Sequence, residues 1–455
     1  MRRATRNGLV FGALLLCVFG AWVIFGGVGP GAPPVKSQRE NVLIIVADDL
    51  GVDVLECYGE GSSFPPTPTI DMLADTGVLF RNAWSNPMCS TTRATIQTGR
   101  HSFRTGVGSI VLPGGTNSLQ FSETIIPEVL DLNPLLGYSH AAIGKWHLTG
   151  RLEGGVDGPN LSGYAHFSGT LRNLTRHSYF DWPKTENGEM AKVQEYATTD
   201  NVNEAIEWIN DRGQSPWFMW LAFNAPHTPW HAPPDELHSY DLSGERTPLE
   251  LFQAMVEAMD NEVARLFDSI PQDVFENTNV IFLGDNGTSS GAVQPPFNPR
   301  RAKGTLYEGG INVPLIISGP QVASPGSESG ILVHTTDLFA TALEMMGVDV
   351  EASVPPRTVI DSRSVLPVLQ ERPFDPRLFV YAELFGNRSC YHHGQTIRNT
   401  QGFKLIRFTT HPAEFYNLTL DPFEIANLLL GELDRVQQAN FNELISKIEG
   451  LTGEI

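Results

Sequence analysis

The sequence predicts an α/β protein in which a large mixed, mostly parallel β-sheet is sandwiched by helices, followed by a smaller C-terminal antiparallel sheet and a helix. Three observations carry this prediction. Short apolar runs rich in β-branched residues recur along the chain, helical patterns separate them, and a proline-rich stretch precedes a set of shorter strand-like pieces. Strands that alternate with helices are typical of a sheet covered on both faces, and such sheets bind ligands beyond the carboxyl ends of their strands.

The strands of the larger sheet are predicted from continuous apolar runs. Asn41–Ala47 reads NVLIIVA, which is typical of a strand buried on both faces. Comparable runs, each ending in polar or Gly/Pro-rich sequence, occur at Trp217–Phe223, Asn279–Leu283 and Val313–Ser318. Helical patterns occur at Thr69–Asp75, Asp200–Asp211, Leu249–Ile270 and Thr335–Met346.

A domain boundary is expected in the turn-like, proline-rich segment Pro355–Arg377. The larger domain is predicted to span residues 40–365 and a C-terminal subdomain residues 366–455. Within the subdomain, the strand-like pieces LFVYAEL, FKLIRF and EFYNL are followed by a helix predicted from Asp434 to Ile448.

The N-terminal residues 1–36 have the features of an export signal. Arg2, Arg3 and Arg6 precede an almost unbroken apolar stretch, Gly8–Val28, and a Pro/Gly-rich linker. The arginines would hold the N-terminus in the cytoplasm and place the rest of the chain outside it, in the periplasm or another extracytoplasmic space. The segment is either an uncleaved membrane signal-anchor or a cleaved signal peptide. The length of the apolar stretch and the lack of a clear small-x-small cleavage site favour the anchor.

The composition excludes several classes of protein. The chain has 31 Lys and Arg against 51 Asp and Glu, a formal net charge of −20. It lacks the clustered basic residues that nucleic-acid binding needs, so we predict no nucleic-acid partner. An anionic substrate would therefore need a local cationic pocket. Four cysteines in 455 residues also exclude a disulfide scaffold.

Acidic and amide side chains follow two of the predicted strands. Asp48 and Asp49 come directly after the first strand, and Asp285 and Asn286 follow the strand NVIFL after a single glycine. Oxygen ligands of this kind suit a hard divalent cation, calcium or magnesium. Either pair alone would be read as a helix or turn cap, but the two pairs together predict a metal site.

Four further segments carry candidate site residues. Cys89 lies four residues before Arg93 at the predicted start of a helix, where free N–H groups attract anions. Lys145 and His147, His227, and Lys303 each lie in a Gly- or Pro-marked loop. Taken singly, such residues are more often a structural cysteine, a surface lysine or a structural histidine.

The motifs resemble those of the sulfatase family, the formylglycine-dependent branch of the alkaline-phosphatase-like superfamily. The resemblance runs from Asn41 to Leu430 and rests on VADDLG, CSTTRATIQTGR, GKWHLTG, APHTPW, LGDNGT, KGTLYEGGINVPLIISGP and FYNLTLDPFEIANLL. It implies an alkaline-phosphatase-like fold and hydrolysis of a sulfate ester, on a small molecule or a saccharide. It also implies that Cys89 is oxidised to formylglycine by a maturation enzyme. The metal, usually calcium with magnesium as the alternative, would be held by residue 89 and by Asp48, Asp49, Asp285 and Asn286.

The resemblance also implies roles for the basic residues. Arg93, Lys145 and Lys303 would bind the sulfate oxygens with the metal. His227 and Lys303 would protonate the leaving alcohol, and His147 would accept a proton from the hydrated aldehyde. In the family, the maturation enzyme reads an unfolded Cys-x-Pro-x-Arg or Cys-x-Ala-x-Arg motif, and this chain has Thr91 at the third place.

Two alternatives remain open from the sequence. A metal and a formylglycine could equally serve a phosphonate or phosphate ester hydrolase of the same superfamily. A chain whose Cys89 is not converted would be a sulfatase-like protein that binds sulfated ligands without hydrolysing them.

Overall fold

The computed structural model describes residues 39–151, 153–386 and 393–453. The chain divides into two units, Met1–Ser37 and Gln38–Ile455, and the second contains all the elements described below. The predicted N-terminal anchor or signal peptide lies outside the described residues. Within those residues, the structure contains no helix of the length and apolarity that crossing a membrane requires.

In the described part of the chain, ten strands form one sheet in the order β10-β2-β9-β8-β1-β7-β3-β4-β5-β6. The strands are β1 (Asn41–Ala47), β2 (Gly77–Trp84), β3 (Ser139–Lys145), β4 (His166–Thr170), β5 (Trp182–Glu186), β6 (Glu189–Val193), β7 (Trp217–Ala222), β8 (Thr278–Gly284), β9 (Leu315–Ser318) and β10 (Ser327–His334). The central strands β8, β1, β7, β3 and β4 are parallel, whereas β9 and the β5–β6 hairpin pair antiparallel to their neighbours. The sheet is therefore mixed and mostly parallel, as predicted.

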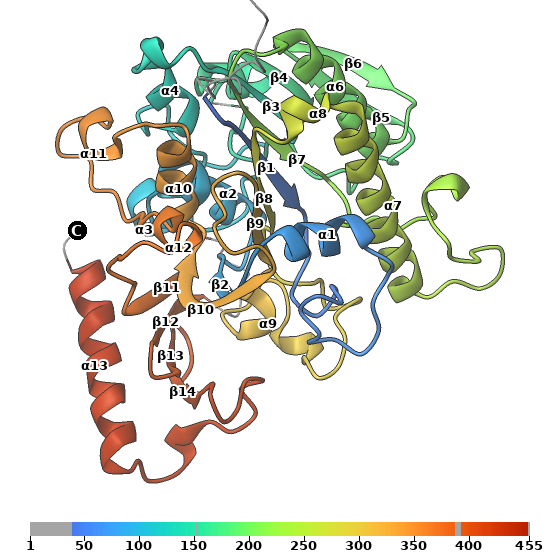
Figure 1. The fold of residues 1–455 in the computed structure, drawn as a ribbon. Coiled ribbons are helices and arrows are strands. Elements are labelled where there is room, and N and C mark those ends of the chain that lie inside the picture. Colours follow the sequence, from blue (N-terminus) through green and yellow to red (C-terminus); the bar gives the residue numbers. More distant parts are fainter. Residues whose placement is uncertain (1–38, 152, 387–392, 454–455) are drawn as a thin grey trace, which may run out of the picture. The chain divides into compact units, whose positions relative to one another are not determined.

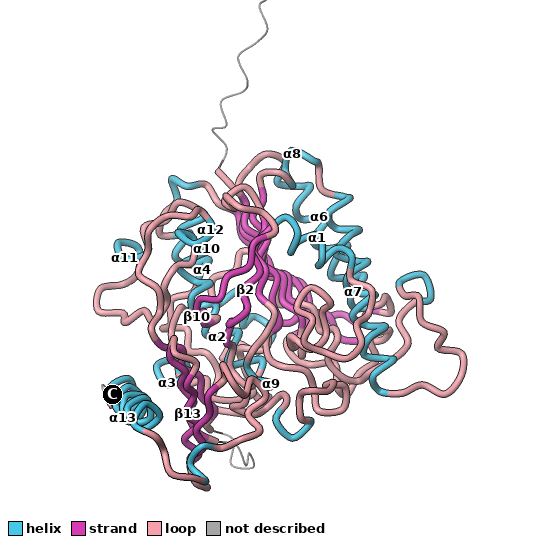
Figure 2. The backbone as a smooth tube through the Cα atoms, turned by 60° about the horizontal axis from the view of Figure 1, so that its bottom comes forward, coloured by secondary structure: helices cyan, strands magenta, loops and turns pink. Residues whose placement is uncertain are grey.

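Helices cover both faces of this sheet (Figures 1 and 2). Side chains alternate along β1, so that Leu43 and Ile45 face one layer and Val42 and Ile44 face the other. The first layer contains α1 (Pro68–Thr76), α6 (Ala197–Arg212) and α7 (Pro248–Ser269). The second contains α2 (Cys89–Thr98), α4 (Ile126–Asp131), α10 (Asp337–Met345) and α12 (Leu366–Leu369). Shorter helices are α3 (Ser102–Thr105), α5 (Gly158–Leu161), α8 (Gln272–Phe275), α9 (Glu308–Ile311) and α11 (Val350–Ser353).

A second, antiparallel sheet follows in the order β11-β12-β13-β14. Its strands are β11 (Phe379–Leu384), β12 (Gly394–Asn399), β13 (Phe403–Phe408) and β14 (Glu414–Asn417). The terminal helix α13 (Arg435–Thr452) lies along this sheet (Figure 1) and buries Leu444 and Ile448 against it. The small sheet and α13 lie wholly within the predicted subdomain, residues 366–455. The boundary itself stays a prediction, since residues 38–455 form one compact unit.

The fold brings the candidate site residues to one edge of the sheet. β8, β1, β7 and β3 are consecutive parallel neighbours, so their carboxyl ends meet. Asp48 follows β1, Asp285 follows β8, and the segment with His227 follows β7. Lys145 ends β3, and His147 comes two residues later.

Candidate active site

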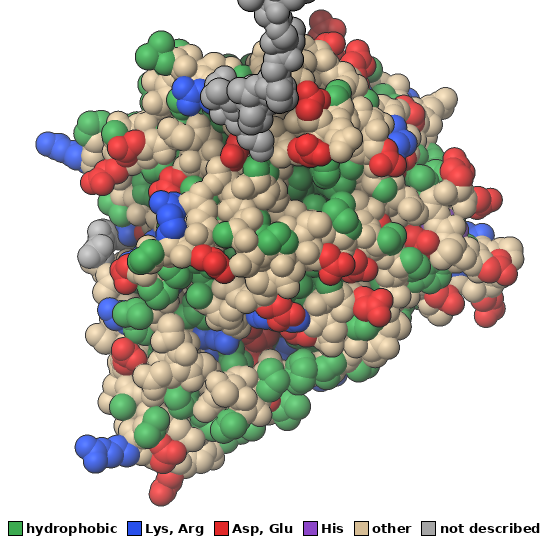
Figure 3. Space-filling model, in the orientation of Figure 1, with side chains coloured by type: hydrophobic (Ala, Val, Ile, Leu, Met, Phe, Trp, Pro, Cys, Tyr) green, Lys and Arg blue, Asp and Glu red, His purple; other side chains and the backbone are tan. Residues whose placement is uncertain are grey.

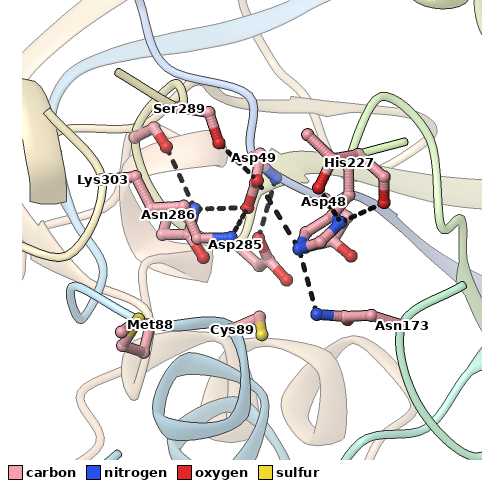
Figure 4. Close-up of polar contacts among 12 residues, drawn as sticks. Asp48, Asp49, Met88, Cys89, Asn173, His227, Asp285, Asn286, Ser289 and Lys303 are labelled. Carbon is pink, nitrogen blue, oxygen red and sulfur yellow. Dashed lines mark hydrogen bonds and ion pairs between the residues drawn. The ribbon is translucent and has the colours of Figure 1, made fainter. Parts of the chain in front are cut away.

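The acidic residues after β1 and β8 form a single buried cluster (Figure 4). The backbone N–H of Asp49 donates to Asp285 Oδ1 at 3.2 Å. Asn286 Nδ2 donates to Asp49 Oδ1 at 2.9 Å. Asp48, Asp285 and Asn286 are fully buried, and Asp49 is only 1% exposed. The two pairs, which lie more than 230 residues apart in the sequence, therefore converge in one cluster.

Backbone conformation at this edge of the sheet is unusual. Asp49 has φ of 73° and His147 has φ of 59°, in the left-handed region that residues with a side chain rarely adopt. Gly144, at the start of GKWH, has φ of 90°, and a Cβ atom there would lie 2.0 Å from the carbonyl oxygen of Ala222. The strands are thus packed so closely that this motif requires glycine.

Cys89 is the first residue of α2 and faces the acidic cluster (Figure 4). Its Sγ lies 3.3 Å from Nδ1 of His147. Ligand atoms of Cys89, Asp48 and Asp285 all lie within 4.8 Å of one another. Burial raises the pKa of the Cys89 thiol, although the Lys145 ammonium opposes this shift. The unmodified thiol is therefore protonated at neutral pH and is a poor nucleophile.

Each of the three carboxylates is paired with a cation, of which Arg93 and Lys145 are buried and Lys303 is partly exposed. Arg93 donates from Nε and Nη2 to Asp285 Oδ2, at 2.9 and 2.8 Å. Lys145 pairs with Asp48, and Lys303 pairs with Asp49. Burial raises the pKa of Asp49, but the Lys303 ammonium outweighs it, so that the pKa falls well below its usual range. Burial lowers the pKa of Lys303, but Asp49 outweighs it and leaves the pKa above its usual value.

His227 lies on the other side of Asp49. Its Nδ1 donates to the carbonyl oxygen of Thr228 at 2.7 Å, so Nε2 is the acceptor for the Asn173 amide at 3.0 Å. Nε2 also lies 3.8 Å from Asp49 Oδ2. Burial lowers the pKa of His227 to about 4, and burial together with Lys145 holds the pKa of His147 well below its usual value. Both imidazoles are thus neutral at neutral pH.

Comparison with known proteins shows the family of the chain. The Sulfatase family model matches residues 40–348. This chain belongs to the sulfatase family. It is also 30% identical to the N-acetylgalactosamine-6-sulfatase of Rattus norvegicus in an alignment of 410 residues that covers 81% of this chain and 72% of the relative.

Further matches cover nearly all of this sulfatase. The model of the C-terminal region of N-sulphoglucosamine sulphohydrolase matches residues 301–450. A sulfatase of Formosa agariphila is 27% identical over 86% of this chain and 85% of its own. The crystal structure of Ps i-CgsB in complex with k-i-k-neocarrahexaose has a TM-score of 0.76 at 25% identity and covers 91% of this chain and 93% of its own. The protein is therefore an enzyme that hydrolyses sulfate esters, and its predicted family and fold are confirmed.

The acidic cluster of this sulfatase fits a divalent metal. Oδ1 of Asp48 and Oδ1 of Asn286 are buried oxygens for which no described residue supplies a hydrogen bond. A buried acceptor without a partner is costly, and a hard cation bound by oxygen ligands would satisfy both. Asp48, Asp49 and His227 also place ligand atoms within 4.8 Å of one another. The cluster is therefore able to hold a metal ion.

The sulfatase site includes two side chains that the sequence analysis missed. Ser289 Oγ donates to Asp49 Oδ2 at 2.9 Å, and Asn173 contacts His227 as described above. Ser289 could have been found, because it follows Asp285 and Asn286 in the polar run DNGTSS. Asn173 lies in a loop after β4 with no recognisable pattern, and only the fold brings it to the site.

Proposed function

We propose that this sulfatase uses residue 89, converted from cysteine to formylglycine, as the nucleophile of sulfate ester hydrolysis. The observation that carries this assignment is the position of Cys89. It lies at the first turn of a buried helix, 3.3 Å from a neutral imidazole and beside three paired carboxylates and cations. A buried thiol with a raised pKa would be inert at this place, whereas an aldehyde would not depend on losing a thiol proton.

Hydrated formylglycine supplies two hydroxyl groups on one carbon, one to attack sulfur and one to expel sulfate on deprotonation. His147 is the group positioned for that deprotonation. Its Nδ1 is the ring nitrogen nearest to residue 89, and it is neutral, so it is able to accept a proton.

Arg93, Lys145 and Lys303 bind and orient the sulfate group in this proposal. Ion pairs with Asp285, Asp48 and Asp49 hold these three side chains in position, so the donors are in place before the substrate binds. Fixed donors of this kind stabilise charge that develops on the transferring group without reorganising during the reaction.

Lys303 and His227 together assist the departing alkoxide. Lys303 is protonated at neutral pH and is 17% exposed at its side chain, so it is able to donate a proton to an oxygen in the site. In the neutral ring, Nε2 of His227 accepts from Asn173 and has no proton to give. His227 therefore donates a proton to the alkoxide only when Nε2 is protonated.

The metal we propose is calcium, with magnesium as the alternative. Asp48, Asp49, Asp285, Asn286 and residue 89 would hold it, a set dominated by hard oxygen ligands. When bound, it supplies positive charge that polarises the sulfate ester and favours ionisation of a hydroxyl group.

A sulfated saccharide is the substrate class we propose. Ps i-CgsB was crystallised with neocarrahexaose, and BT4656, which shares the fold, with its substrate D-glucosamine-2-N,6-O-disulfate. Export through the segment that precedes residue 38 would bring this enzyme to such saccharides outside the cytoplasm. Before it can act, the protein would need a formylglycine-generating enzyme to convert Cys89.

Turnover and mass together test this function. Protein co-expressed with a formylglycine-generating enzyme should hydrolyse aryl and saccharide sulfates faster than the matching phosphate esters. Its Cys89 peptide should be lighter than the cysteine form by about 18 Da, the mass difference between a thiol and an aldehyde. Cys89→Ser should fold but lose multiple turnover.

A preference for phosphate or phosphonate esters would instead identify the superfamily's other hydrolase activity. Full turnover with an intact Cys89 thiol would contradict the proposed nucleophile, and ligand binding without any turnover would identify a sulfatase-like binding protein.

A further inference from the structure

A cavity of about 520 Å³ opens beside the active site. Its wall is built from four segments: residues 110–113, His147 and Arg151 after β3, residues 170–177 from the end of β4 onwards, and the β5–β6 hairpin. His147 and Asn173 line it, and these two residues also contact Cys89 and His227. A substrate whose sulfate lies at residue 89 would therefore extend its neighbouring groups into this cavity.

The charge of the cavity is opposite to that of the protein. Acidic side chains are spread over the face drawn in Figure 3, and the whole chain carries a net charge of −20. The cavity wall nevertheless contains Arg151, Arg172 and Arg176, and no Asp or Glu is present among its described residues. This is the local cationic pocket that an anionic substrate of an acidic enzyme requires.

Of these arginines, Arg172 is half-buried and Arg151 and Arg176 are exposed, and they differ from the arginines that pair with aspartates in having no partner among the described residues. Arg93, Arg104 and Arg377 are each paired with an aspartate. The guanidinium groups of the three cavity arginines make no ion pair or hydrogen bond with any described residue, and the buried Nε of Arg172 has no acceptor among those residues. Burial and the nearby charge of Arg151 both lower the pKa of Arg172. The structure thus leaves a partly buried charge and a buried donor unsatisfied, which is costly without an anion to accept from them.

Arg172 is also held in position relative to the catalytic residues. It directly precedes Asn173, and the side chain of Asn224 donates to the Arg172 carbonyl oxygen at 3.3 Å. Asn224 lies three residues before His227 and accepts a hydrogen bond from Thr170 at 2.9 Å. The Arg172 backbone and the His227 loop therefore form one connected unit.

We propose that this cavity is a second anion-binding subsite, and that the substrate carries an additional sulfate or carboxylate group on the sugar next to the one that is desulfated. Arg172 and Arg151 bind this group, and a guanidinium fork matches the oxygens of either anion. Leu171, Leu174 and Met190 supply the apolar part of the wall against which a sugar ring can lie. This inference rests on the proposed function and names the class of saccharide: one with two or more anionic groups.

The test uses three matched disaccharides that share one O-sulfate and carry a hydroxyl, a sulfate or a carboxylate on the neighbouring sugar. Wild-type enzyme should have a higher kcat/KM for the two doubly anionic substrates than for the singly sulfated one. Arg172→Gln should reduce that preference by about 10- to 100-fold, the effect of losing one or two charged hydrogen bonds. Arg151→Gln, at an exposed position where folding is not at risk, should reduce it in the same direction. Arg435→Gln, exposed on α13, should leave the preference unchanged.

A binding measurement on an inactive variant tests the subsite independently of the proposed catalytic function. In the Cys89→Ala background, which cannot form formylglycine, calorimetric titration should give tighter binding of the doubly anionic disaccharides. Raising the salt concentration should weaken that preference, and Arg172→Gln should remove it. A wild-type enzyme that turns over no sulfate ester would overturn the proposed function, while this titration would still report on the subsite. Equal affinity for all three disaccharides, or a preference that survives Arg172→Gln and Arg151→Gln, would overturn the subsite.

Discussion

At the scale of single residues, the active site is a balance of buried charges. Asp48, Asp49 and Asp285 are each paired with a cation, because a carboxylate removed from water is stable only when paired or bound to a metal. Oδ1 of Asp48 and Oδ1 of Asn286 are buried and accept no hydrogen bond from any described residue. The site therefore has the donors and charges that a metal and a sulfate need before either binds.

Removing one carboxylate should disturb both the metal and the sulfate group. In Asp49→Asn the shape is retained, but the negative charge that faces Lys303 and attracts the metal is lost, and an amide group replaces one of the two carboxylate oxygens. We expect kcat/KM to fall by at least about 100-fold, as when a single electrostatic contact to a transition state is lost. The metal content measured by mass spectrometry should fall with it.

Asp268→Asn, at an exposed position of α7, is the matched control and should retain both metal and activity. Full metal content and turnover in Asp49→Asn would contradict the assignment of this residue to the metal site.

At the scale of the element, α2 holds residue 89 in place. Every residue of this helix is buried, and its first turn is tied to its surroundings by side chains. Ser90 Oγ accepts from the backbone N–H of Val111 at 3.1 Å, and Thr92 Oγ1 accepts from the N–H of Asn86 at 2.9 Å. Residue 89, the proposed nucleophile, thus lies on a buried helix rather than in a loop.

The first turn of α2 also allows a test of the maturation motif. The N–H of Thr91 lies in this turn, where an α-helix provides no acceptor, so proline is tolerated there. We expect Thr91→Pro to raise the formylglycine fraction at residue 89, measured by peptide mass, without changing turnover per converted site. The cost should be about 1 kcal/mol, from the lost hydrogen bond between Thr91 Oγ1 and the Met88 carbonyl oxygen.

Thr91→Ser, which keeps the hydroxyl group, is the control for Thr91→Pro and should leave the formylglycine fraction at residue 89 unchanged. A wild-type fraction already near complete would show that the maturation enzyme accepts threonine and that the departure from the family motif has no consequence.

At the scale of the whole molecule, the two sheets are joined by a buried ion cluster. Lys404 of β13 is fully buried and pairs with Glu308 at 2.9 Å and Glu424 at 2.8 Å. Its ammonium also lies 4.8 Å from the ring centre of Trp84, at the end of β2. Glu308 begins α9, five residues after Lys303, so the C-terminal subdomain supports the segment that carries Lys303 of the candidate site.

Breaking this cluster should destabilise the protein strongly. Lys404→Met keeps much of the side chain but leaves two buried carboxylates without their ammonium. We expect the free energy of unfolding in urea to fall by about 3–5 kcal/mol, the usual cost of breaking a buried ion pair from one side.

Lys192→Met is the matched control, because its ion pair with Asp181 is exposed and should contribute less than about 1 kcal/mol. A loss no larger in Lys404→Met than in Lys192→Met would show that the two sheets do not depend on this cluster.

The sequence by itself determined the family, the strands β1, β7 and β8, and the candidate residues that the fold brings together. Asn41–Ala47 was predicted as observed, and α7 and α10 were found within a few residues, because continuous β-branched runs and helical periodicity are local signals. The acidic pairs after β1 and β8 were recognisable for the same reason, since each follows a strand directly. The strands β2, β3, β4, β5, β6, β10 and β12 were not predicted. GVLFRNAW and SHAAIGK, for example, mix small, polar and charged residues with apolar ones, and only burial between neighbouring strands selects the strand conformation.

Only the tertiary structure decided which side chains meet. Asn173 reaches His227, and Arg151, Arg172 and Arg176 gather in one cavity, although these loop residues form no pattern along the chain. Loops after parallel strands converge at one edge of a sheet whatever their separation in sequence, so their contacts depend on strand order rather than on local composition. The chemistry of the reaction is therefore encoded in motifs beside strands, whereas the shape and charge of the substrate pocket arise from the order in which those strands assemble.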